Sequence, residues 1–102
     1  MTPTQRSLAK LRADGYTVAI VEHWNGFTKR RHDLFGFVDI LALREGETLA
    51  IQATSGSNVS ARVNKIAEHE NVAAVRKAGW RIAVWGWRKV GNRWQVREVD
   101  VS

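Results

Sequence analysis

The chain has 102 residues, of which 44% are hydrophobic and 25% charged, and it contains no cysteine. This composition predicts one globular domain over residues 1–102 with a core of its own, and it excludes disulfide frameworks and thiolate zinc sites. No apolar run approaches the roughly 20 residues that span a membrane, and the first residues lack the order of a signal peptide. We therefore expect a cytoplasmic protein without membrane contact.

The net charge of +6 suggests a polyanionic partner such as nucleic acid. The basic residues are clustered: Lys29, Arg30 and Arg31 precede His32, and three more basic residues surround a later turn (Arg88, Lys89 and Arg93). Composition alone leaves solubility as an equally good explanation for the charge.

The first third of the chain predicts a helix, a strand and a loop. Thr2, Pro3 and Gln5 form a capping-box pattern at a helix start, and Gly15 ends that helix. Residues 16–21 are rich in β-branched side chains and predict a strand. Residues 23–32 are polar and are expected to form a loop.

The rest of the chain predicts two strand pairs separated by helices. Residues 37–43 and 48–54 predict two buried strands joined by a turn at residues 44–47. Residues 55–58 break the pattern and precede a helix with an apolar stripe, and a further short helix starts near Asn71 and ends at Gly79. Residues 80–87 and 94–101 alternate as strands around a turn at Gly91 and Asn92. The order α-β-β-β-α-β-β predicts an α/β fold, a mixed sheet with flanking helices, in which the helical crossover joins parallel strands.

Asp39 is the first candidate for function, because it lies inside an apolar stretch. A buried carboxylate is unfavourable by several kcal/mol unless a cation or hydrogen bonds compensate it. Gln52 and Thr54 are polar side chains near the end of the following strand. The alternatives are that Asp39 is a hydrogen-bonded structural acid and that Gln52 and Thr54 are ordinary sheet residues.

This order of elements, with a buried Asp and a polar-x-polar pair, resembles the PD-(D/E)XK nuclease superfamily and its restriction-endonuclease-like core. Within it the chain is most similar to archaeal-type Holliday-junction resolvases and small phage nuclease-like proteins. The family's metal-binding Asp falls on Asp39, its Glu on Gln52 and its Lys on Thr54, with 12 residues between Asp39 and Gln52. For the Glu that many resolvases carry in the first helix, the nearest candidates are Gln5 and Ser7.

The resemblance implies a metal-dependent, structure-specific DNA endonuclease that hydrolyses phosphodiesters with Mg²⁺ or Mn²⁺. The implied metal ligands are Asp39, Gln52, the Ala53 carbonyl and Asp33, and the implied catalytic residues also include Thr54 and Lys65. Phosphates of DNA, with branched or junction DNA favoured, are expected to contact five basic residues: Lys29, Arg30, Arg31, Arg62 and Lys65. Symmetric cutting of two strands implies a homodimer.

The motif departs from the family pattern, which leaves other functions open. Asp39 with Gln52 supplies one negative charge where the family has two, and Thr54 cannot replace the charge of a lysine. Arg62 or Lys65 is expected to compensate the missing cation, and Asp33 the missing carboxylate. One alternative is a catalytically degenerate nuclease-fold protein that binds DNA. Another is a protein-interaction module whose tryptophans Trp80, Trp85, Trp87 and Trp94 bind a protein partner.

Overall fold

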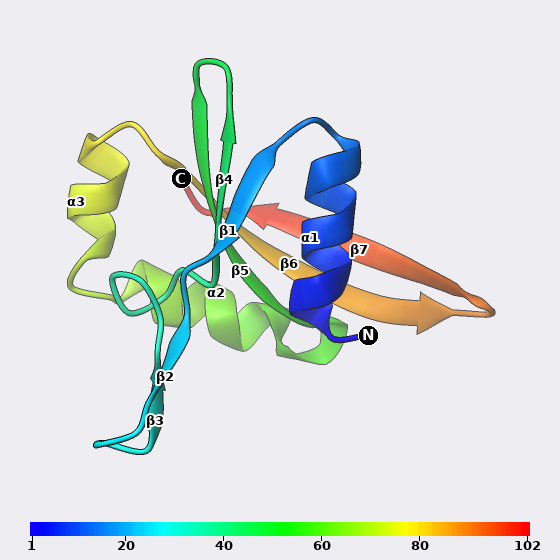
Figure 1. Ribbon diagram of the computed structural model, residues 1–102, viewed down its shortest axis with the longest axis horizontal. Helices are drawn as coiled ribbons and strands as arrows, with labels where there is room; N and C mark the ends of the chain where they lie inside the picture. Colours follow the sequence, from blue (N-terminus) through cyan, green and yellow to red (C-terminus); the bar gives the residue numbers. More distant parts are fainter.

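The computed structural model describes residues 1–102 and contains a five-stranded mixed sheet, helices on both of its faces and a separate two-stranded hairpin (Figure 1). The strand order in the sheet is β1-β4-β5-β6-β7. The elements are α1 (Pro3–Ala13), β1 (Thr17–Ile20), β2 (His23–Asn25), β3 (Arg30–His32), β4 (Ile40–Arg44), β5 (Glu47–Ser55), the 3-10 helix η1 (Gly56–Asn58), α2 (Val59–Ala67), α3 (Val72–Lys77), β6 (Arg81–Val90) and β7 (Arg93–Asp100). The α/β class and the mixed sheet are as the sequence predicts.

The first helix begins where the capping-box pattern predicts. The Thr2 hydroxyl accepts the backbone N–H of Gln5, and the Gln5 side chain accepts the N–H of Thr2. Inside α1 the fully buried Ser7 donates to the Pro3 carbonyl and accepts the indole N–H of Trp87 at 2.8 Å. These bonds attach α1 to β6.

The central strands have the pairing that their connections dictate. β4 and β5 are antiparallel and joined by a tight turn, with Arg44 opposite Glu47. β5 and β6 are parallel, because η1, α2 and α3 form the crossover between them. β1 pairs with β4, and β7 pairs with β6, both antiparallel.

Alternation along the strands produces two cores, one on each face of the sheet. Leu49 and Ile51 of β5 pack with Leu8 and Leu11 of α1 on one face. Ala50, in contrast, belongs to the core on the other face, which includes Val59, Ile66, Val72 and Val75 of α2 and α3. The even-numbered residues of β5 therefore face α2.

Residues 23–32 are a β-hairpin and not the predicted loop. The side-chain oxygen of Asn25 accepts the backbone N–H groups of Phe27 and Thr28, and this local turn brings β2 and β3 together. The polar composition indicated a loop because both faces of this hairpin are largely exposed to solvent. Figure 1 shows the hairpin extending away from the body of the molecule.

The predicted strand 37–43 begins later than expected, at Ile40. Leu34 and Val38 exchange backbone hydrogen bonds at 3.0 Å, and Phe35 and Gly36 between them have positive φ angles. Residues 34–38 therefore form a tight turn, and Asp39 lies directly before β4 and not within a strand. No helix in the fold combines the length and apolar character that crossing a membrane requires.

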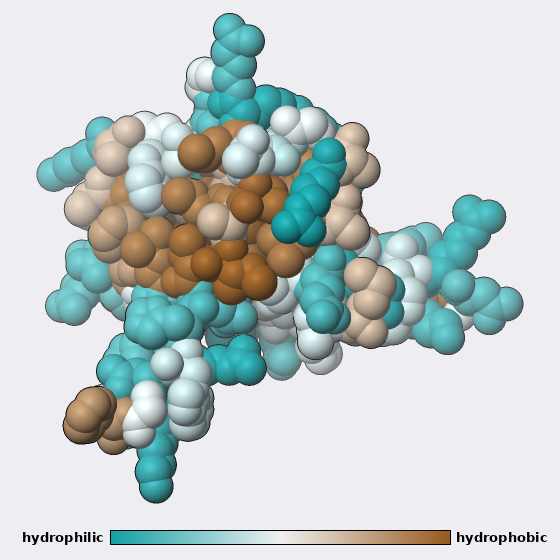
Figure 2. Space-filling view, in the orientation of Figure 1, coloured by the Kyte–Doolittle hydropathy of each residue, from teal (hydrophilic) through white to brown (hydrophobic).

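Figure 2 shows apolar side chains gathered across the middle of one face of the molecule. The projecting hairpin is mostly hydrophilic in the same view, with apolar atoms at its far end. Trp85 and Trp87 are buried in the core, whereas Trp94 is exposed on the surface.

Candidate metal site at the start of strand β4

Asp39 is held at the start of β4 by backbone hydrogen bonds to both neighbouring segments. Its carbonyl accepts the N–H of Val21 and its N–H donates to the Ile51 carbonyl, both at 2.9 Å. Its carboxylate Oδ2 accepts the backbone N–H of Ala53 on β5 at 3.0 Å. The side chain is only 6% exposed.

Two further carboxylates lie beside Asp39. Glu22 follows β1, and Asp33 follows β3; one carboxylate oxygen from each of Glu22, Asp33 and Asp39 lies within 4.8 Å of the other two. The pairing of Ile20 with Ile40 brings the end of β1 next to the start of β4, and closure of the β2–β3 hairpin returns Asp33 to the same place. We call Glu22, Asp33 and Asp39 the acid cluster.

The acid cluster is electrostatically unfavourable without a cation. Burial, together with the negative charges of Asp33 and Glu22, raises the pKa of Asp39 from 3.8 to about 7, against the opposing effect of the hydrogen bond from the Ala53 N–H. Only one basic side chain, Arg31, forms an ion pair with the cluster, at 3.4 Å from Nη1 to the Glu22 carboxylate. Carboxylate oxygens in this arrangement are the ligands that Mg²⁺ and Mn²⁺ prefer.

Gln52 and Thr54 lie on the next strand, on the face of the sheet that α2 covers. Gln52 is 1% exposed, and neither its amide oxygen nor its amide nitrogen has a hydrogen-bond partner. A buried amide without partners is unfavourable by roughly 1–3 kcal/mol or more, so this residue is poorly explained as a plain sheet residue. The carbonyl of Ala53 points to the same side of β5 as its own N–H, toward Asp39.

The turn that carries Asp33 is fixed by the segment between α2 and α3. Gly36 has φ of +88°, and a Cβ added there would lie 2.3 Å from the Nε2 atom of His69. The Asn71 side chain donates to the Phe35 carbonyl at 3.1 Å, and the His69 ring packs edge-on against Phe37. These contacts hold the chain between Asp33 and Asp39 in one conformation.

The other predicted site residues occupy several elements. Lys29, Arg30 and Arg31 lie on the β2–β3 hairpin, and all three are exposed. Arg62 and Lys65 lie on α2, where neither forms an ion pair with an acidic side chain.

Gln5 and Ser7, the candidates for a ligand in the first helix, are occupied by structural hydrogen bonds of α1. Arg31 forms its ion pair with Glu22.

Sequence reasoning did not find Glu22 as a member of the site. The available signal was its position directly after the apolar run 16–21, at the end of a strand. Glu22 lies near Asp39 only because β1 pairs antiparallel with β4. The residue pattern of each strand does not specify which strands pair, so Glu22 could not be selected from the sequence.

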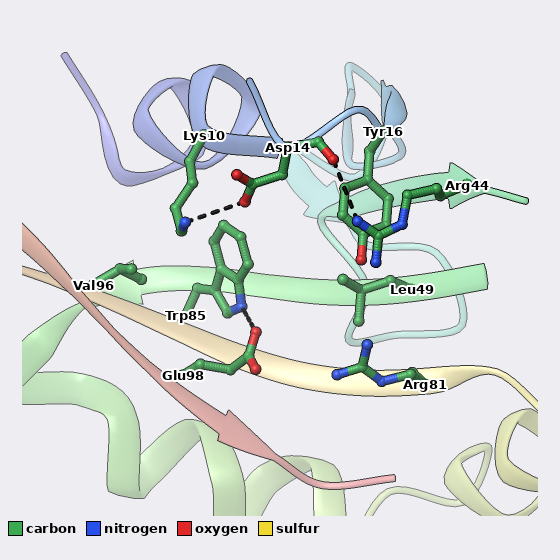
Figure 3. Close-up of a pocket in the computed structure, with 9 residues that line it drawn as sticks. All are labelled: Lys10, Asp14, Tyr16, Arg44, Leu49, Arg81, Trp85, Val96 and Glu98. Carbon is green, nitrogen blue, oxygen red and sulfur yellow. Dashed lines mark hydrogen bonds and ion pairs between the residues drawn. The ribbon is translucent and has the colours of Figure 1, made fainter. Parts of the chain in front are cut away.

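A cavity of about 470 Å³ lies on the opposite face of the sheet, beside α1 (Figure 3). Its charged groups already have partners: Lys10 pairs with Asp14 at 3.1 Å, and Glu98 accepts the indole N–H of Trp85 at 2.6 Å. Arg44 donates to the Asp14 carbonyl and pairs with Glu47. Because these groups satisfy one another, the acid cluster is the stronger candidate site.

A scan against protein-family models finds no match for this chain, and a search of curated proteins finds no matching relative. The function must therefore be inferred from the chemistry of the site.

Proposed function

We propose that this protein is a metal-dependent, structure-specific DNA endonuclease of the Holliday-junction-resolvase type, with a restriction-endonuclease-like core. The observation that supports this most directly is the acid cluster, three carboxylates within 4.8 Å of one another with a single cationic partner. The unpartnered amide of Gln52 and the basic hairpin beside the cluster add to it.

In this proposal Glu22, Asp33 and Asp39 hold Mg²⁺ or Mn²⁺, with the Gln52 amide oxygen and the Ala53 carbonyl as further ligands. A divalent ion bound there supplies positive charge for the phosphodiester and lowers the pKa of water. Glu22 restores the negative charge that Gln52 lacks relative to the family's glutamate.

The remaining predicted residues have supporting roles in this proposal. The hydroxyl of Thr54 orients a water molecule, and Lys65 or Arg62 provides the cation that the family's lysine would supply. Lys29, Arg30 and Arg31 contact phosphates next to the site. Cutting both strands symmetrically requires two copies of the chain, which predicts a homodimer.

A second function deserves a test because no lysine contacts the acid cluster. In that alternative the fold binds DNA through its basic hairpin and a bound metal serves only stability. Metal-dependent nicking separates the two functions, since both predict binding to DNA.

The decisive experiment is cleavage of four-way, flap and linear DNA with Mg²⁺ and with Mn²⁺. We expect Asp39→Asn to reduce the rate of cleavage at least about 100-fold, because one metal ligand is removed while the hydrogen bond from Ala53 can still form. The matched control is Glu45→Gln, which removes the same charge from the exposed β4–β5 turn and should leave the rate unchanged. Calorimetry with Mg²⁺ or Mn²⁺ measures metal binding in the same proteins.

If folded Asp39→Asn protein cuts DNA as fast as the parent, the metal site is wrong. If the parent binds DNA and metal but never nicks any substrate, the second function replaces the first.

A further inference from the structure

The β2–β3 hairpin carries exposed aromatic side chains and basic side chains, and it contains no acidic residue. Its basic side chains include Lys29, Arg30 and Arg31. Phe27 at the turn is fully exposed, and Trp24 is 61% exposed. Exposed aromatic rings flanked by arginine and lysine are the side chains with which proteins stack on bases and contact phosphates of nucleic acids.

The turn of the hairpin holds Phe27 outward in a defined conformation. Asn25 accepts two backbone N–H groups, from Phe27 at 2.9 Å and from Thr28 at 3.3 Å. Across the strands, the rings of His23 and His32 stack with centroids 5.8 Å apart. Because the turn is ordered by its own side chains, Phe27 can insert into a partner at a smaller entropic cost.

The hairpin starts and ends at the acid cluster. Glu22 directly precedes β2, and Asp33 directly follows β3. Trp24 lies opposite Arg31 on one face of the ribbon, next to a hollow of about 210 Å³ lined by Ile20, Glu22 and His23 as well. The face of the hairpin that carries Trp24 and Arg31 therefore leads into a hollow that a member of the acid cluster, Glu22, also lines.

Building on the proposed nuclease function, we propose that the β2–β3 hairpin is a wedge for branched DNA. Phe27 stacks on the terminal base pair at a branch point, and the face of Trp24 and Arg31 directs one strand toward the acid cluster. Stacking of a base on an aromatic ring requires no particular sequence, and Lys29 and Arg30 contact the flanking phosphates. Within a continuous duplex each base pair is already stacked on both sides, so Phe27 has no base on which to stack. The wedge therefore gives branched DNA a higher affinity than continuous duplex.

The length of the hairpin sets where the cut falls. Phe27 is five positions after Glu22 in the sequence, which in an extended strand corresponds to about 17 Å. At about 3.4 Å per nucleotide, the cut is expected about five nucleotides from the branch point.

The wedge is tested by binding without metal, so that the readout is independent of cleavage. Fluorescence anisotropy in EDTA compares a forked DNA, carrying 2-aminopurine at the branch point, with the fully paired duplex. Phe27→Ala should weaken binding to the fork about 5- to 150-fold, because aromatic stacking contributes about 1–3 kcal/mol per base, and it should leave duplex binding unchanged. Phe27→Trp should retain the preference for the fork. Binding to the fork should raise the fluorescence of 2-aminopurine, and this rise should require an aromatic residue at position 27.

Lys29→Gln serves as the comparison that weakens binding to fork and duplex alike. If folded Phe27→Ala binds the fork as tightly as the parent, the wedge is overturned while the nuclease function stands. If the parent binds neither DNA, both proposals are overturned.

If Phe27 is needed only for binding vesicles of phosphatidylserine and phosphatidylcholine, the hairpin is a membrane contact and the wedge is wrong. If Phe27-dependent fork binding occurs in a protein that never cuts DNA, the wedge is supported and the nuclease function fails.

Discussion

At the scale of single residues, the unusual feature is a buried carboxylate whose neighbours are also acidic. Burial and the charges of Asp33 and Glu22 raise the pKa of Asp39 to about 7, and Arg31 offsets part of the negative charge through Glu22. The folded protein therefore holds a proton that the unfolded chain, with a pKa of 3.8 at this residue, releases. A bound divalent cation would remove the same repulsion.

This proton predicts how the stability of the metal-free protein depends on pH. Between about pH 4 and pH 7 the folded state binds more protons at Asp39 than the unfolded state, so the free energy of unfolding should fall as pH rises and level off above pH 7. The loss is at most about 4 kcal/mol, the free-energy equivalent of this pKa difference. Urea unfolding at pH 5 and pH 8 should show a smaller pH effect in Asp39→Asn. Equal pH effects in the two proteins would contradict the assignment.

At the scale of elements, the acid cluster depends on a turn that belongs to no helix or strand. Residues 34–38 fold back on themselves, and His69 and Asn71 hold them from the segment between α2 and α3. Gly36 is required there for two separate reasons, its positive φ angle and the position of the His69 ring. The segment between α2 and α3 thus influences the position of the acid cluster without contributing a carboxylate to it.

Gly36→Ala should destabilise the protein by about 2 kcal/mol or more and weaken metal binding. Gly79→Ala is the matched control, because Gly79 has a similar φ of +81° but nothing within 4 Å of the added Cβ. The difference between the two variants, measured by urea unfolding, isolates the clash with His69. Adding His69→Ala should recover part of the loss in Gly36→Ala, and no recovery would mean that the ring does not contact this glycine closely.

At the scale of the whole molecule, the basic hairpin and the acid cluster lie together, and the longest dimension is 38 Å. This length corresponds to about one turn of duplex DNA. One copy of the chain can therefore contact roughly 6 to 10 phosphates at most. The charge of +6 is then compatible with electrostatic binding.

DNA affinity should therefore fall steeply with salt, by about 10³- to 10⁵-fold between 50 and 200 mM if roughly 6 to 10 phosphates are contacted. Replacing Lys29 and Arg30 by Gln should reduce the slope of log affinity against log salt by about 2. Arg93→Gln, at the turn between β6 and β7, should leave the slope unchanged because this turn projects from a different side of the molecule than the β2–β3 hairpin (Figure 1). An affinity that does not change with salt would favour the protein-interaction module.

Elements with local signals could be predicted from the sequence. The capping box at Thr2, the turn at residues 44–47 and the helical crossover before β6 follow from neighbouring residues, and the crossover in turn predicts the mixed sheet. Asp39 and Gln52 could also be selected, because polar groups in apolar stretches need compensation wherever the stretch lies in the fold. Three features, in contrast, could be found only from the folded chain: Glu22 joins Asp33 and Asp39, the expected loop is a hairpin, and Gly36 lies against His69. These features arise from strand pairing and from contacts between distant segments, whose energies depend on the whole packed chain and not on the pattern of any single segment.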